Sequence, residues 1–76
     1  MVAAKEIGKR LQFLRAKKNV SALEVCRATG IMQSAYSNYE TGARVPRDEN
    51  KILLARYFGV PIDTIFFSDG FTYSEE

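Results

Sequence analysis

Four polar side chains between positions 33 and 38 have the chemistry to bond to the base edges of a nucleic acid. They are Gln33, Ser34, Ser37 and Asn38. Glutamine and asparagine amides can each form paired hydrogen bonds with adenine N6 and N7, and serine hydroxyls can bond to several bases. At helical spacing these side chains form one outward row, which is either a base-reading surface or an ordinary solvated helix face.

The polar row requires a short helix whose opposite side packs against the rest of the protein. Tyr36 and Tyr39 interrupt the row, and their spacing predicts that both rings pack inward rather than stack on bases. A preceding helix is predicted to begin at Ala22, because Ser21 and Glu24 have the spacing of a capping box.

A tight turn joins these two predicted helices. Gly30 stands where the first helix must end and the backbone must bend. Cys26 is small enough for two helices to cross closely there, and we expect it to be buried and unreactive. Met32 offers no side-chain oxygen to the first amides of the following helix, so that helix starts without a good cap. The stretch therefore predicts a helix-turn-helix.

Three further helices are predicted around this motif, over residues 5–18, 48–58 and 61–66. Apolar residues at helical spacing mark the inward face of each one. These residues are Ile7, Leu11, Leu14, Ile52, Leu54, Ala55, Phe58, Ile62, Ile65 and Phe66. The 76 residues are thus predicted to form one all-α domain of five helices with its core in residues 5–66.

The last ten residues, 67–76, contain an Asp-Gly turn signal between aromatic flanks, which fits a short hairpin and a loose tail equally well. The fifth helix and this tail carry more apolar area than so small a core requires, which predicts a dimer interface. Its residues are Ile62, Ile65, Phe66, Phe67, Phe71 and Tyr73. Phe13 lies off the apolar stripe of the first helix and covers either the edge of the core or a partner subunit, the core edge being the preferred interpretation.

The net charge of +2 is too small to indicate nucleic-acid binding by itself. Basic residues are concentrated in the first helix, whereas Glu75 and Glu76 end the chain. We expect the lysines and arginines of that helix to form a mainly solvated face, with Lys17 and Lys18 as secondary phosphate contacts. The residues expected on this face are Lys9, Arg10, Lys17 and Lys18.

One cysteine and no histidine exclude an internal disulfide, a Cys/His zinc site and a histidine-dependent catalytic triad. The sequence also lacks a useful carboxylate pair and a glycine-rich phosphate loop. We therefore expect no catalytic residue, no metal, no cofactor and no small-molecule ligand. No apolar run approaches the roughly 20 residues of a membrane span, and there is no signal-peptide pattern, so a cytoplasmic protein is expected.

The ordered set of motifs resembles the Cro and repressor type of helix-turn-helix domain. The set comprises IleGlyLysArgLeu, the stretch GlyIleMetGlnSerAlaTyrSerAsnTyrGlu, ThrGly, Pro46, LeuLeuAla, PheGlyValPro and IleAspThrIlePhe. The resemblance covers residues 7–66. It implies a lambda-repressor-like fold and a bacterial or phage-encoded, nucleoid-associated regulator. Such a protein would bind double-stranded DNA as a homodimer on a palindromic operator, most often as a repressor, with its third helix in the major groove.

The resemblance also implies roles for single residues. Gln33, Ser34 and Asn38 match base-reading positions, and Ser37 matches a position that contacts either bases or phosphate. Arg44 and Arg47 match positions that contact the DNA backbone. An arginine late in the first helix commonly pairs with the glutamate at the end of the third, which here predicts a structural ion pair between Arg15 and Glu40.

Three positions depart from the family pattern. Ala22 replaces a phosphate-gripping glutamine, Met32 replaces a serine or threonine, and Lys51 stands where leucine is common. The first two departures remove expected phosphate contacts. They keep open a second function, in which the same fold serves as a protein-interaction module such as an antitoxin-like or anti-repressor subunit.

Overall fold

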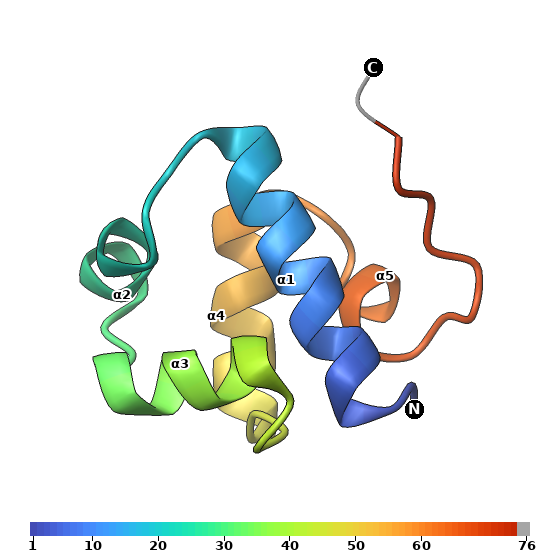
Figure 1. Ribbon diagram of the computed structural model, residues 1–76, viewed down its shortest axis with the longest axis horizontal. Helices are drawn as coiled ribbons and strands as arrows, with labels where there is room; N and C mark the ends of the chain where they lie inside the picture. The colour runs from blue at the N-terminus through green and yellow to red at the C-terminus, as the bar shows by residue number, and fades with distance from the viewer. Residues whose placement is uncertain (75–76) are drawn as a thin grey trace.

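Five α-helices follow one another in the computed structural model, which describes residues 1–74 (Figure 1). They are α1 (Ala4–Lys18), α2 (Ala22–Thr29), α3 (Gln33–Thr41), α4 (Asp48–Phe58) and α5 (Ile62–Phe66). Residues 1–74 contain no strand, which confirms the all-α prediction and rules out the hairpin in the described part of the tail. Glu75 and Glu76, the acidic end of the predicted tail, lie outside the described residues.

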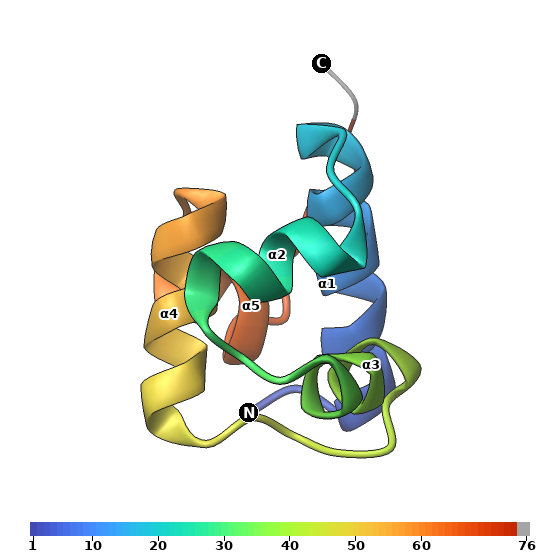
Figure 2. The ribbon, with the colours of Figure 1, turned by 90° about the vertical axis from the view of Figure 1, so that its left-hand side faces the viewer.

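The capping chemistry of α2 explains where it begins and ends. The Ser21 hydroxyl oxygen accepts a hydrogen bond from the Glu24 amide at 3.1 Å, and the Ser21 amide donates to Glu24 Oε1 at 2.8 Å. Gly30 ends the helix with φ 80°, a left-handed conformation that glycine adopts without a steric penalty. The chain then turns so that α2 and α3 cross at a steep angle (Figure 2).

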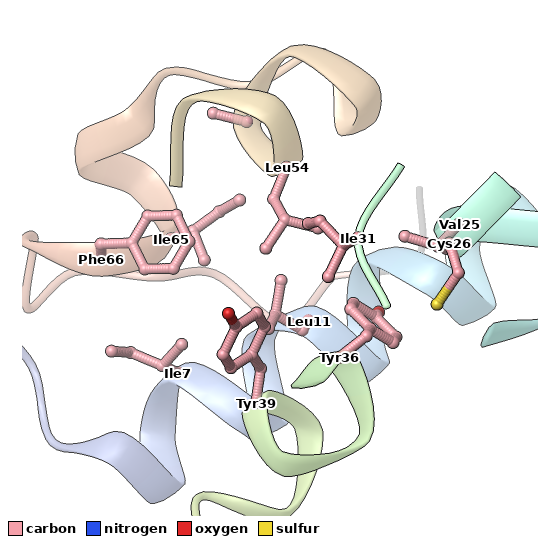
Figure 3. Packing of buried hydrophobic residues seen from close by; sticks show 11 residues of the cluster. Ile7, Leu11, Val25, Cys26, Ile31, Tyr36, Tyr39, Leu54, Ile65 and Phe66 are labelled. Carbon is pink, nitrogen blue, oxygen red and sulfur yellow. The ribbon is translucent and has the colours of Figure 1, made fainter. Parts of the chain in front are cut away.

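All five helices contribute side chains to the core (Figure 3). Its buried apolar residues are Ile7, Leu11, Val25, Cys26, Ile31, Tyr36, Tyr39, Leu54, Ala55, Ile65 and Phe66. Both tyrosines of α3 therefore point inward, as their spacing predicted. Cys26 is buried as well.

The inward prediction for Ile52 is wrong, because its side chain is 44% exposed. The buried stripe of α4 contains Lys51, Leu54 and Ala55, and Ile52 lies one position off it. The aliphatic stem of Lys51 is covered while its Nζ reaches Asp48 Oδ1 at 3.5 Å and lies 5.2 Å from the centre of the Phe67 ring. On α4 the buried position is therefore filled by Lys51, and the neighbouring Ile52, which the apolar pattern predicted to be buried, is exposed.

Helices α1 and α3 come into backbone contact at Gly8. A Cβ atom added to this glycine would lie 2.3 Å from the backbone oxygen of Glu40 and 2.9 Å from that of Tyr39. No larger residue fits at this crossing without moving one helix. The sequence predicted a close crossing of the second and third helices at Cys26, whereas this crossing of α1 and α3 at Gly8 was not predicted, because the partner of Gly8 is 32 positions away.

Arg10 does not belong to a solvated basic face, which corrects the prediction. It is 2% exposed, and its Nη1 donates to the backbone oxygens of Thr64 at 3.1 Å and Ile65 at 3.3 Å. Its Nε pairs with Glu6 Oε2 at 3.0 Å. The guanidinium therefore satisfies carbonyls at the end of α5 that have no partner within that short helix.

The tail that follows α5 turns back and runs along α1 (Figure 1). Phe13 meets the rings of Phe71 and Tyr73 edge to face, with centroids 5.8 and 5.3 Å apart. The Tyr73 hydroxyl donates to Glu6 Oε2 at 2.6 Å, and this bond together with the nearby Arg10 lowers the pKa of the Glu6 carboxyl. Phe13 thus covers the edge of the core against the chain's own tail.

Candidate nucleic-acid interface

The outer side of α3 presents the polar row that the sequence predicted. Gln33, Ser34 and Ser37 are exposed, and Asn38 is half-buried. Tyr36 and Tyr39 anchor the opposite side of the helix, with side chains 1% and 6% exposed. Helix α3 lies along the lower edge of the molecule in Figure 1.

Glu40, near the end of α3, fixes that helix to α1. Its Oε2 accepts from Arg15 Nε at 2.7 Å and its Oε1 accepts from Arg15 Nη2 at 3.1 Å. The Tyr36 hydroxyl donates to the same carboxylate at 2.6 Å, and Gln12 Nε2 donates to the Glu40 backbone oxygen at 2.8 Å. The structure therefore joins the two residues that the resemblance pairs and adds a tyrosine to them. These hydrogen bonds fix the position of α3, and with it the polar row, relative to α1.

Alkaline pH should weaken the fold through Tyr36. Burial and the hydrogen bond to Glu40 raise the pKa of Tyr36 well above its ordinary value of 10.0. Above that pH the unfolded chain loses this proton while the folded chain keeps it. The free energy of unfolding should then fall by as much as about 1.4 kcal/mol per pH unit from this group. Urea denaturation between pH 9 and 11 measures the slope, which should become shallower in Tyr36→Phe; an unchanged slope would contradict the assignment.

The loop between α3 and α4 carries two exposed cations. Arg44 and Arg47 are exposed and line a groove of about 390 Å³ that runs between this loop and the turn before α3. The remaining lining residues are Gly30, Ile31, Met32, Ala35, Tyr39, Val45 and Asn50. The Arg44 amide donates to the Asn38 backbone oxygen at 3.1 Å, which holds the start of the loop against α3. The structure thus places both arginines in the loop that follows α3, on a groove that none of the predicted base-reading side chains lines.

Lys5 is a further cation close to the end of α3, and it was not among the phosphate contacts predicted from the sequence. It is exposed, and its backbone and Cγ lie against Gly42, the residue that ends α3. Only the packing of the start of α1 on the end of α3 reveals this position.

The structure does not bring Lys17 and Lys18 to the α3 surface. They stand at the end of α1 that is opposite α3 in Figure 1. Lys17 Nζ donates to the Ser74 backbone oxygen at 3.4 Å, and Lys18 Nζ lies 5.0 Å from the centre of the Tyr57 ring. Lys17 therefore lies against the tail and Lys18 against α4. The structure gives no support for the prediction that the two lysines contact phosphates of a duplex bound at α3.

The predicted dimer residues divide into three groups. Ile65 and Phe66 are completely buried in the core of their own chain, which corrects their assignment to a surface. Phe71 is half-buried against Phe13. The remaining three are at least partly accessible: Ile62, Phe67 and Tyr73. The two buried residues were misassigned because apolar excess in a sequence does not distinguish a core position from a surface position.

A family model described as helix-turn-helix matches residues 11–65, which is most of the chain. The protein therefore belongs to the helix-turn-helix family, as the resemblance predicted.

One relative has a described role. The chain is 32% identical over 53 residues to the "Cryptic phage CTXphi transcriptional repressor RstR" of Vibrio cholerae. The match covers 70% of this chain and 48% of the relative, so the chain spans about half the length of the curated relative it matches. No solved structure matches the chain. Within residues 1–74, none of the helices is long and apolar enough to cross a membrane.

Proposed function

We propose that the protein is a sequence-specific double-stranded DNA-binding regulator of transcription, acting as a repressor. The observation that carries the proposal is the exposed polar row of α3, held outward by two buried tyrosines and by the Arg15–Glu40 pair. An α-helix fits the major groove of B-DNA, where amide side chains can distinguish adenine from other bases. Arg44 and Arg47, exposed in the loop that follows α3, supply the charge that phosphates require. The similarity to a phage repressor supports the same function.

The protein should act as a homodimer on a palindromic operator. A single domain of this size buries a small interface and offers few base contacts, so useful affinity calls for two copies on half-sites about one helical turn apart. An exposed apolar groove on α4 and α5 is suited to the contact between protomers, and Ile52 and Ile62 both line it. Phe67, 43% exposed, adds apolar surface just after α5.

Gln33→Ala should weaken binding to the true operator by about 1 to 3 kcal/mol and leave binding to random DNA almost unchanged. The operator is first obtained by selecting bound sequences from random duplexes. Fluorescence anisotropy then measures Kd for operator and random DNA, and sedimentation counts protomers per duplex, with two expected. Equal loss on both DNAs would make Gln33 a positioning contact rather than a base-reading one.

Arg44→Ala is the matched contrast to this variant. Loss of a phosphate contact should weaken operator and random DNA alike and lower the slope of log Kd against log salt by about 1. The protein-interaction alternative keeps the support of Ala22 and Met32, the two departures from phosphate-binding residue types. It predicts no duplex binding that falls steeply with salt, so the same titration separates the two functions.

A further inference from the structure

Met32 is the most exposed large hydrophobic residue of the described chain, with 73% of its surface accessible. It occupies the N-cap of α3, and its backbone already has cap geometry, with φ −65° and ψ 144°. Its backbone oxygen accepts from the Tyr36 amide at 2.9 Å. A serine here would place its hydroxyl near the free amides of the helix, as Ser21 does for α2. Methionine therefore forgoes a cap and exposes an apolar side chain to water.

The position of Met32 indicates what could cover that side chain. Met32 directly precedes Gln33 and lines the groove that Arg44, Val45 and Arg47 border from the other loop. Two cations on one groove favour a polyanion, and Gln33, which directly follows Met32 and begins the polar row, matches the edges of bases. The only apolar group that bases present in the major groove is the 5-methyl of thymine. A duplex seated on α3 would bring such a methyl within reach of Met32 and exclude water from both.

We infer that Met32 is a specificity-determining residue that selects thymine in each half-site by contacting its 5-methyl group. This inference rests on the proposed function, since it needs α3 in the major groove. This contact explains why methionine occupies position 32, where a serine would cap the helix. Removing a methyl-sized apolar contact corresponds to about a fourfold change in affinity.

The test uses the operator duplex obtained by selection and removes single methyl groups from it. Each thymine is replaced in turn by deoxyuracil, which keeps all hydrogen bonds and lacks only the methyl. We expect one thymine per half-site at which this replacement raises Kd about fourfold for the natural protein. Met32→Leu should keep that sensitivity, because it keeps an apolar side chain of similar size.

Met32→Ser is the decisive variant, because it should improve the fold while abolishing the discrimination. The new hydroxyl should cap α3 and raise Tm by about 5 °C, yet the variant should bind thymine and deoxyuracil operators equally. Undiminished deoxyuracil sensitivity in this variant overturns the inference, as does a natural protein insensitive to every replacement. In both cases a normal Gln33→Ala effect leaves the proposed function standing. If no sequence is selected from random DNA at all, the proposed function and this inference fall together.

Discussion

Gly8→Ala should lower the free energy of unfolding by about 3 kcal/mol, a large fraction of the stability of a domain this small. Helix propensity alone predicts the opposite sign, since alanine is favoured over glycine by about 1 kcal/mol within a helix. The packing decides the outcome. The new Cβ would lie 2.3 Å from the Glu40 backbone oxygen and 2.8 Å from its carbonyl carbon. Neither atom belongs to a flexible side chain, so α1 and α3 must separate.

Urea denaturation followed by circular dichroism measures this loss. Gly70→Ala is the matched control, because its added Cβ would meet only the Ser68 hydroxyl at 3.8 Å. That variant should differ from the natural protein by less than about 0.5 kcal/mol. If Gly8→Ala proved as stable as the control, the two helices could not be in backbone contact at this point.

The helices were predictable from the sequence because local chemistry marks their ends. The capping box of Ser21 and Glu24 and the glycine at position 30 bound α2 within a few residues, without help from distant parts of the chain. The five-helix fold followed from those boundaries and from apolar spacing. The inward orientation of Tyr36 and Tyr39 was likewise predictable, since a helix has only one face toward the core.

The roles of charged residues in the core were not predictable in this way. Arg10 is buried because carbonyls more than 50 positions later need its guanidinium, and Lys51 is buried because Asp48 and Phe67 accommodate its amine. The sequence around Arg10 does not indicate its distant carbonyls, and the sequence around Lys51 contains Asp48 but gives no sign of Phe67. Apolar spacing therefore predicted that Ile52 is buried, whereas in α4 the buried side chain is that of Lys51.

In the candidate interface, too, features of a single helix were predictable from the sequence, whereas features that depend on the packing of two helices were not. Gln33, Ser34 and Ser37 lie on one helix, so helical spacing was enough to place them on a common exposed face. Lys5, Lys17 and Lys18 lie on another helix, and only the crossing of α1 over α3 determines which lysines are near. The start of α1 meets the end of α3 at Gly42, which selects Lys5 and separates the two later lysines from the row.

Glu40→Ala should lower the free energy of unfolding by about 3 kcal/mol. The carboxylate is 12% exposed and accepts three hydrogen bonds, two from Arg15 and one from Tyr36. Its removal leaves a partly covered guanidinium and a buried hydroxyl without their acceptor, and both then carry a desolvation penalty. Urea denaturation measures the loss. Glu49→Ala, a change of the same type at an exposed position in the first turn of α4, should alter stability by less than about 0.5 kcal/mol.

A double-mutant cycle with Arg15→Ala separates pairing from incidental damage. We expect a coupling free energy of about 1 to 2 kcal/mol between the two positions, and a value near zero would mean that the ion pair does not hold the helices. The Arg15→Ala variant also tests whether this arginine contributes to DNA binding as well as to stability. At a temperature where Arg15→Ala is still folded, its salt dependence of duplex binding should equal that of the natural protein, whereas Arg44→Ala should lower it. Arg15 is committed to Glu40, and a cation already bonded to a carboxylate releases no counterion from a phosphate.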